Sequence, residues 1–422
     1  MHLDLLNDVR IVECSAFIAA PLAGMVMAQF GADVIKVDMI GGPVDYGRMP
    51  VMPGGRSLYW TGLNKAKRSI AVDLRKPEGR ELVQALASAG GDEGGTLLTN
   101  TGSHWLSHAG LVKRRPDMIS CTIEGNGDGS TAVDYTVNCA AGFPAMTGWG
   151  SSEAPVNHVL PAWDIACANH AAFALVSAIA RRRRTGAGAE LRLALSDVAF
   201  STLGNLGLLA EAELLRRDRP SIGNYLYGAF GRDFATRDGA RLYVAAVSLG
   251  QWKKLVEATD SSRQFAALEA SLGLNFEREQ HRFSAREAIA ALLEPWFSER
   301  TMPEASRALD AAKACWGRYQ TVSQGLRQDP RLSEDNPVFS YMETAGVGRH
   351  LAAGSIVRET GATQSPGKPA PLLGQHTDEV LSEVLRLTSA HIGKLHDTEV
   401  VAGVDHDPMI HPVENDAALK LG

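Results

Sequence analysis

The chain has 422 residues, of which 42 are Lys or Arg and 48 are Asp or Glu, so its formal net charge is −6. Because 45% of the residues are hydrophobic and only 21% are charged, the composition excludes a wholly disordered chain. The acidic balance also argues against a nucleic-acid-binding protein, since affinity for phosphates requires concentrated Lys and Arg.

The sequence has no feature of a secreted or membrane-bound protein. The N-terminal residues lack a basic stretch followed by an apolar run, so we predict no signal peptide. We find no 18 consecutive apolar residues without a charge, and we therefore predict no membrane span. The five cysteines are odd in number and form no C-x-x-C pair, which argues against a disulfide scaffold and a zinc site. We expect a cytoplasmic protein without a bound metal.

The first 125 residues alternate short apolar strands with helices. The helices are predicted at 21–30 and from Pro77 to about Ala89, where the proline suits the first helical turn. Short apolar strands spaced by helices are typical of βαβ units and a mostly parallel sheet. The predicted strands are Val9–Cys14, Asp33–Asp38, Ser69–Leu74, Thr96–Thr99 and Met118–Ile123.

An alanine-rich helix is predicted from Asp164 to Arg184. Arginines fill its last turn and Gly186 lies just beyond it, and both features are signals that end a helix. A strand at Leu191–Leu195 and a long helix at Asp197–Arg217 follow.

A turn-rich segment from Asp218 to Gly239 interrupts this pattern. A strand at Leu242–Val247 and mainly helical sequence to about Leu326 come after it, and we interpret them as a second domain. We predict an α/β protein with a doubly wound, mostly parallel, Rossmann-like sheet and a smaller α/β domain. The predicted parts are 1–217 for the large domain, 218–330 for the small domain with its Gly-rich loop, and 331–422 for a segment that returns to the large domain.

Several common enzyme motifs are missing. The turn after the first strand, at 15–21, has no G-x-G-x-x-G, whose glycines let the backbone approach a pyrophosphate. The sequence also contains no G-x-x-x-x-G-K-[ST], H-E-x-x-H or G-x-S-x-G. These absences argue against an NAD or FAD enzyme, a P-loop enzyme and a hydrolase with the nucleophilic serine of the G-x-S-x-G motif.

Two sets of charged residues have alternative interpretations. The cations Lys65, Lys67 and Arg68 directly precede a strand, and they form either a solvated loop or a site for an anionic ligand at the sheet edge. Asp164 lies at the start of the alanine-rich helix, where an Asp often serves as the N-cap. Amides at the start of a helix also stabilise an ionised carboxylate, so a nucleophilic role is the alternative.

Several motifs, in one order, resemble those of the family III CoA-transferases, and the resemblance extends from about Leu6 to His396. In that family an aspartate at the start of the central helix is the catalytic residue, and Asp164 stands at its position, 185 − 164 = 21 residues before Thr185. The motifs that carry the resemblance are Gly31-Ala32-Asp33-Val34-Ile35-Lys36-Val37, Asn64-x-x-Lys67-Arg68-Ser69-Ile70-x-x-Asp73-Leu74, Pro77-Glu78-Gly79 and Arg184-Thr185-Gly186-Ala187-Gly188.

Four further stretches are most similar to family members that move CoA between the two carboxyls of one mesaconate molecule. The resemblance implies covalent catalysis by Asp164, with an anhydride and an aspartyl-CoA thioester as intermediates and no cofactor beyond the CoA of the substrate. It also implies an interlocked homodimer. The stretches are Ser15–Leu22, Asp134–Asn138, Asn157–Asp164 and Gly223–Phe234.

The resemblance assigns further site residues by position. Asp134 stands where an acidic residue assists the nucleophile in some relatives, although an exposed turn carboxylate is the alternative. Ile18 replaces a Gln of the formyl-transferring relatives, and Met39 replaces an Arg that stacks on CoA. The residues predicted to contact CoA are Phe17, Ala19, Val72, Arg75, Asn100 and Thr101.

Three other functions stay open at this point. An intermolecular CoA-transferase that acts on dicarboxylates would use the same Asp164 and the same fold. An acyl-CoA racemase needs a His just before Asp134, where this chain has Val133. A CoA-binding protein without turnover is the third alternative, and an intact Asp164 argues against it.

Overall fold

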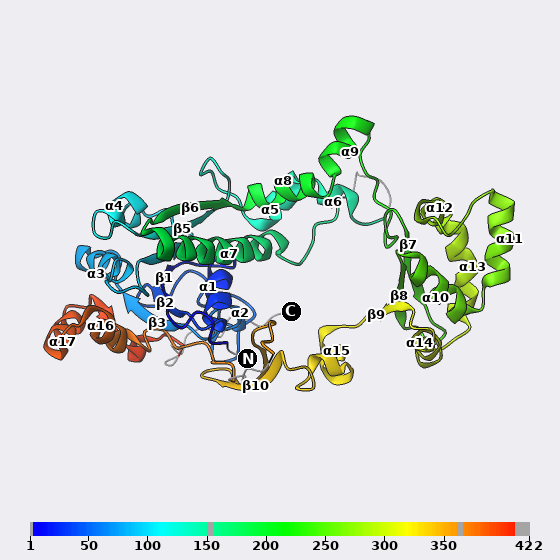
Figure 1. Ribbon diagram of the computed structural model, residues 1–422. Coiled ribbons are helices and arrows are strands. Elements are labelled where there is room, and N and C mark those ends of the chain that lie inside the picture. Colours follow the sequence, from blue (N-terminus) through cyan, green and yellow to red (C-terminus); the bar gives the residue numbers. More distant parts are fainter. Residues whose placement is uncertain (1–2, 150–154, 361–365, 410–422) are drawn as a thin grey trace. The chain divides into compact units, whose positions relative to one another are not determined.

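The computed structural model describes residues 3–149, 155–360 and 366–409, which form two compact units (Figure 1). The first unit combines residues from both ends of the chain with residues from its middle. Along the sequence, the two segments of the second unit alternate with the three segments of the first. The first unit comprises 1–141, 159–207 and 330–422, and the second comprises 142–158 and 208–329.

These boundaries differ from the predicted ones at two segments and at Pro330, which belongs to the first unit. Residues 142–158 and 208–217, which we placed in the large domain, belong to the second unit. The predicted helix at Asp197–Arg217 is in fact two helices, α8 (Leu195–Asn205) and α9 (Leu208–Leu215). Gly207 separates them with a φ of 75°, a left-handed conformation that ends a helix and that glycine adopts readily.

The first unit is built on a seven-stranded sheet with the order β12-β3-β2-β1-β4-β5-β6. All neighbouring pairs are parallel except β12 and β3, which are antiparallel. The strand order reverses between β1 and β4, so the sheet is doubly wound and the predicted fold class is confirmed. The strands are β1 (Arg10–Cys14), β2 (Asp33–Asp38), β3 (Arg68–Val72), β4 (Thr96–Thr99), β5 (Ile119–Glu124), β6 (Ala189–Ala194) and β12 (Val401–Ala402).

Side chains of β1 and β2 alternate between the two faces of this sheet. Val12 and Ile35 join the hydrophobic core formed with α3 (Pro77–Ala87), α4 (His108–Val112), α16 (Thr377–Leu385) and α17 (Ser389–Asp397). Glu13 points to the other face, where its carboxylate lies against Gly24 of α1 (Ala19–Gln29). This helix packs on α7 (Ala162–Thr185), the longest helix of the described chain.

Helix α7 meets the length and composition expected of a membrane span, although we predicted none. Its most apolar window is 44% buried inside the structure, and the helix packs on α1 and β5. Such a helix is also what the core of a soluble α/β protein requires, because helices on a parallel sheet are buried on one side. We therefore interpret α7 as a core helix.

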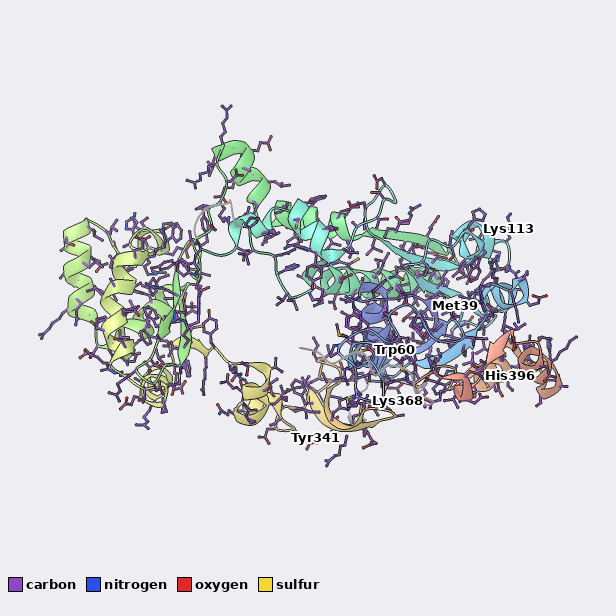
Figure 2. All side chains as sticks on the ribbon, turned by 180° about the vertical axis from the view of Figure 1, so that it is seen from behind. Met39, Trp60, Lys113, Tyr341, Lys368 and His396 are labelled. Carbon is purple, nitrogen blue, oxygen red and sulfur yellow. The ribbon has the colours of Figure 1, made fainter. Side chains whose placement is uncertain are left out.

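Residues after the second unit return to the first. Strand β12 pairs with β3, and the hydroxyl of Thr377 on α16 donates to the Ala402 carbonyl (2.8 Å). Trp60 of α2 lies in the same unit (Figure 2), where it is buried. Its ring packs edge-on against that of Tyr46, with the ring centroids 4.9 Å apart. The other elements of this unit are α2 (Leu58–Leu63), α5 (Asp134–Ala140), β10 (Phe339–Thr344) and β11 (Gly348–Ala353).

The second unit has its own sheet and core. Its three strands are antiparallel in the order β7-β8-β9, and helices α10 to α14 enclose a core that includes Phe230, Trp252 and Phe297. The sequence patterns missed β7, which lies in the segment predicted as turns, and β9. The elements are α6 (Phe143–Met146), β7 (Phe230–Ala235), β8 (Arg241–Ala246), α10 (Leu249–Thr259), α11 (Ser262–Leu272), α12 (Glu279–Ser284), α13 (Arg286–Ser298), α14 (Met302–Ala311), β9 (Cys315–Arg318) and α15 (Val322–Gln328).

Candidate active site

A cavity of about 530 Å³ opens in the first unit at the carboxyl ends of the parallel strands. Residues that directly follow β1, β4, β5 and β6 line it, so it lies at the point where the strand order reverses. This is where doubly wound sheets bind their ligands. The lining residues are Phe17, Ile18, Ala19, Arg48, Tyr59, Asn100, Ile123, Glu124, Gly125, Ala132, Val133, Asp134, Tyr135, Val159, Pro161, Asp164 and Leu195.

The loop after β1 has a fixed conformation. Asn100, which follows β4, accepts the backbone N–H of Ala16 (3.0 Å) and donates to its carbonyl (2.7 Å). Phe17 has a φ of 67°, which is strained for a residue with a β-carbon. The carboxylate of the buried Asp45 holds it there by accepting the Phe17 N–H (2.8 Å). These bonds determine the position of Ala19.

Asp164 is the third residue of α7, and it does not cap the helix. The helix begins at Ala162, and the Oδ2 atom of Asp134 accepts the backbone N–H groups of Trp163 (2.7 Å) and Asp164 (3.1 Å). The N-cap interpretation of Asp164 is therefore wrong, because another carboxylate satisfies the first amides of α7. Asp134 is buried at 2% exposure, which also excludes its interpretation as an exposed turn residue.

The electrostatic surroundings of Asp164 favour the protonated form of its carboxyl. Burial raises the pKa of Asp164 to about 7, and the charge of Asp134 adds to this rise. A hydrogen bond from the backbone N–H of Ala19 opposes it by stabilising the ionised form. A poorly solvated carboxylate that still ionises near neutral pH is a better nucleophile than one in water.

The cavity brings together five of the predicted site residues: Asp164, Asp134, Phe17, Ala19 and Asn100. They come from four separate parts of the chain, namely the loop after β1 with the first residue of α1, the loop after β4, and the helices α5 and α7. The sheet assembles them because the carboxyl ends of its parallel strands meet at one edge.

Val72, Arg75 and Thr101 lie outside the cavity. Val72 is part of the hydrophobic core, and Arg75 is an exposed side chain whose guanidinium pairs with Asp73 (2.9 Å). Thr101 follows Asn100 in the chain, and its hydroxyl lies 3.0 Å from that of Thr99. Met39 directly follows β2 (Figure 2), and it is also absent from the residues that line the cavity. The contact of Val72, Arg75 and Thr101 with CoA stays a prediction.

The patterns missed three polar side chains of the cavity: Arg48, Tyr59 and Glu124. Arg48 follows a turn-rich stretch, and Tyr59 lies on the short helix α2, for which we made no prediction. Glu124 ends β5, and only its place at the carboxyl end of a predicted parallel strand could have indicated a site.

Both interpretations of the cations before β3 are wrong for Lys67. Its ammonium group is buried and donates to Glu13 (2.9 Å), to Asn64 Oδ1 (2.8 Å) and to the carbonyl of Pro21 (2.8 Å). Arg68 pairs mainly with Asp33 (2.6 Å). Lys67 thus connects α1 to β1, Arg68 connects β3 to β2, and neither side chain lines the cavity.

The sequence model described as CoA-transferase family III matches residues 6–377. The chain is 49% identical to 2-methylfumaryl-CoA isomerase of Chloroflexus aurantiacus over 95% of this chain and 98% of the relative. It is 25% identical to formyl-CoA:oxalate CoA-transferase of Rhodopseudomonas palustris, over 94% and 97% of the two chains. The crystal structure of a CaiB/BaiF family protein from Brucella suis shares the fold, with a TM-score of 0.73 and 22% identity over 91% of this chain and all of that one. The protein is a member of CoA-transferase family III.

Proposed function

We propose that this enzyme moves CoA between the two carboxyl groups of mesaconate within one molecule, and so converts 2-methylfumaryl-CoA to 3-methylfumaryl-CoA. The observation that carries the proposal is the 49% identity, over nearly the full length of both chains, to a relative named for this isomerisation. The cavity around Asp164 supplies the carboxylate that such a transfer needs.

The proposed reaction begins with attack by an Asp164 oxygen on the thioester carbonyl. The C–S bond breaks, CoA leaves as a thiolate, and a mixed anhydride forms. The thiolate then attacks the aspartyl carbonyl, which gives an aspartyl-CoA thioester and free mesaconate. Mesaconate attacks this thioester with its other carboxylate, which expels the CoA thiolate and forms a second mixed anhydride. The thiolate then attacks the mesaconyl carbonyl of this anhydride, which gives the isomer and restores the Asp164 carboxylate. No net proton is taken up, and CoA is the only carrier required.

Retention of both fragments is the feature that separates this reaction from intermolecular transfer. A mesaconate that stays in the cavity meets the aspartyl thioester at a high effective concentration, which lowers the barrier by several kcal/mol. The fixed loop at 16–19 supports the transfer itself, because the Ala19 N–H faces the carboxylate that gains and loses charge in each step.

The proposal includes an interlocked homodimer in the cytoplasm. Large apolar side chains on α7 and α8 are exposed in the single chain, among them Phe173 (75%) and Phe200 (42%), and such side chains favour a partner surface. Light scattering coupled to gel filtration tests the dimer. A monomer that is fully active at all dilutions would contradict it.

The test of the function uses purified enzyme and mesaconyl-CoA with its thioester at one defined carboxyl, together with isotopically labelled free mesaconate. We expect the other regioisomer to form without label, and to form no longer with Asp164→Ala. Incorporation of the label, or a requirement for added acid, would favour an intermolecular transferase. Isomer formation that survives the substitution would exclude Asp164 as the nucleophile.

A further inference from the structure

The cavity around Asp164 has more negative than positive groups, although its proposed substrate is itself an anion. Three carboxylates line it: Asp164, Asp134 and Glu124. Two of these have partners in the protein. Asp134 accepts two backbone N–H groups, and Glu124 pairs with Arg192 (2.6 Å). Among the described residues that line the cavity, Arg48 alone carries a positive side chain.

The guanidinium of Arg48 makes no hydrogen bond or ion pair with any group in the part of the chain that the structure describes. Its backbone carbonyl accepts from Ser57, but its five N–H donors are available to a ligand. Two aromatic rings of the cavity fix its position: the guanidinium lies 5.7 Å from the ring centre of Phe17 and 5.2 Å from that of Tyr59. An arginine oriented by rings and without an acidic partner is suited to bind a planar anion.

The hydroxyl of Tyr59 is a second available donor, because it too has no hydrogen-bond partner among the described residues. Burial raises the pKa of Tyr59 to about 12, the Arg48 charge opposes this rise, and the Asp164 carboxylate adds to it. Tyr59 is thus within electrostatic reach of both Arg48 and Asp164, and it remains a neutral donor at neutral pH. The two donors are adjacent, and they line the same cavity as Asp164.

We propose that Arg48, with the help of the Tyr59 hydroxyl, binds the free carboxylate of the acyl group while Asp164 reacts with the thioester at its other end. This inference rests on the proposed function, since it assumes a dicarboxylate as the acyl group. It also explains how mesaconate is retained. Each of its two carboxylates is held by Arg48 in one half of the reaction and reacts at Asp164 in the other half.

The test compares two CoA thioesters that differ in the distal carboxylate. Mesaconyl-CoA carries it, and crotonyl-CoA does not. The measurement is the rate at which hydroxylamine traps the aspartyl-CoA thioester on Asp164, followed by mass spectrometry of the protein. We expect Arg48→Gln to slow trapping with mesaconyl-CoA about 100-fold and to leave the rate with crotonyl-CoA within about threefold. Arg48→Lys should give an intermediate loss of about tenfold, because it keeps the charge but loses the bidentate geometry.

Controls separate this proposal from the function on which it rests. Arg114→Gln removes an arginine that pairs with Glu81 and precedes the amino end of β5, so both rates should stay at the wild-type level. An equal loss with both thioesters would assign Arg48 to the CoA phosphates or to folding, and an unchanged rate with mesaconyl-CoA would exclude it; either result overturns the proposal. If the wild-type enzyme is trapped with both thioesters but forms no regioisomer, the proposed isomerisation is wrong, and a selective effect of Arg48→Gln would still support carboxylate binding.

Discussion

The carboxylate of Asp134 caps the helix that presents Asp164, because its Oδ2 atom accepts the backbone N–H of Asp164 itself at 3.1 Å and that of Trp163 at 2.7 Å. This arrangement has two consequences. It satisfies the amides at the start of α7 and so leaves the Asp164 carboxylate available for reaction. It also places a like charge beside Asp164, which contributes to the raised pKa of that residue.

The first prediction concerns the pH dependence of thioester formation. Because the pKa of Asp164 is raised to about 7 and only the ionised carboxylate attacks, kcat/KM should rise about tenfold per pH unit below neutrality and level off above it. Hydroxylamine trapping over a pH series measures this profile. A profile that is flat from acidic to neutral pH would show that Asp164 ionises at an ordinary carboxyl pKa.

The second prediction separates the two roles of Asp134. Asp134→Asn keeps an oxygen that can accept the amides but removes the charge, so the rising limb of the pH profile should move to lower pH. Asp134→Ala removes the acceptor as well, and we expect it to lower the free energy of unfolding by about 1–3 kcal/mol. Urea denaturation measures this difference. Equal stability of the two variants would argue against the capping role.

A third prediction follows from linkage at Asp164. The folded protein binds a proton at this carboxyl more tightly than the unfolded chain does, because the pKa rises from 3.8 to about 7 on folding. Ionisation therefore destabilises the folded state as the pH increases between these values, by at most about 1.4 kcal/mol for each pH unit. Asp164→Asn should be more stable than wild type at about pH 8 and gain much less at about pH 5. Thermal unfolding at both pH values tests this, and the same gain at both would contradict it.

The fourth prediction concerns the tight contact between α1 and β1. A β-carbon on Gly24 would lie 1.8 Å from Glu13 Oε2, so Gly24→Ala must displace a carboxylate that pairs with Lys67. We expect destabilisation by about 2 kcal/mol or more, despite the higher helix propensity of Ala. Gly393→Ala on the exposed face of α17 is the matched control, since it has open space and should be neutral or stabilising. Urea denaturation measures the free energy of unfolding of both variants, and an equal effect of the two substitutions would contradict the prediction.

A fifth prediction tests the buried ion pair directly. Lys67→Met removes the cation 2.9 Å from the buried Glu13 carboxylate and leaves it only the Lys36 ammonium group at 3.9 Å. Removal of one partner from a buried pair costs up to about 3–5 kcal/mol. A double variant that also carries Glu13→Gln should recover part of this loss, because no charge remains unpaired at the two positions. Stability measured by chemical denaturation would show no recovery if the two side chains did not interact.

The sequence by itself determined the parallel sheet and identified Asp164 as the candidate nucleophile. The strands Asp33–Asp38 and Thr96–Thr99 match β2 and β4 residue for residue, because short apolar strands between helices have few other structures available. The family motifs identified Asp164 together with Phe17, Ala19, Asn100 and Asp134, which the structure brings to one cavity.

Tertiary structure alone decided which charges are used for folding and which for the site. Lys67 and Arg48 are both cations in polar stretches, yet one is buried against Glu13 and the other lies in the cavity with no ionic partner among the described residues. The partner of Lys67 is 54 residues distant in the chain, so no local pattern could reveal it. In the same way, Asp164 looked like a helix cap until the structure placed the carboxylate of Asp134 on its backbone N–H. A charged side chain takes its role from the groups around it, and those groups come together only in the folded chain.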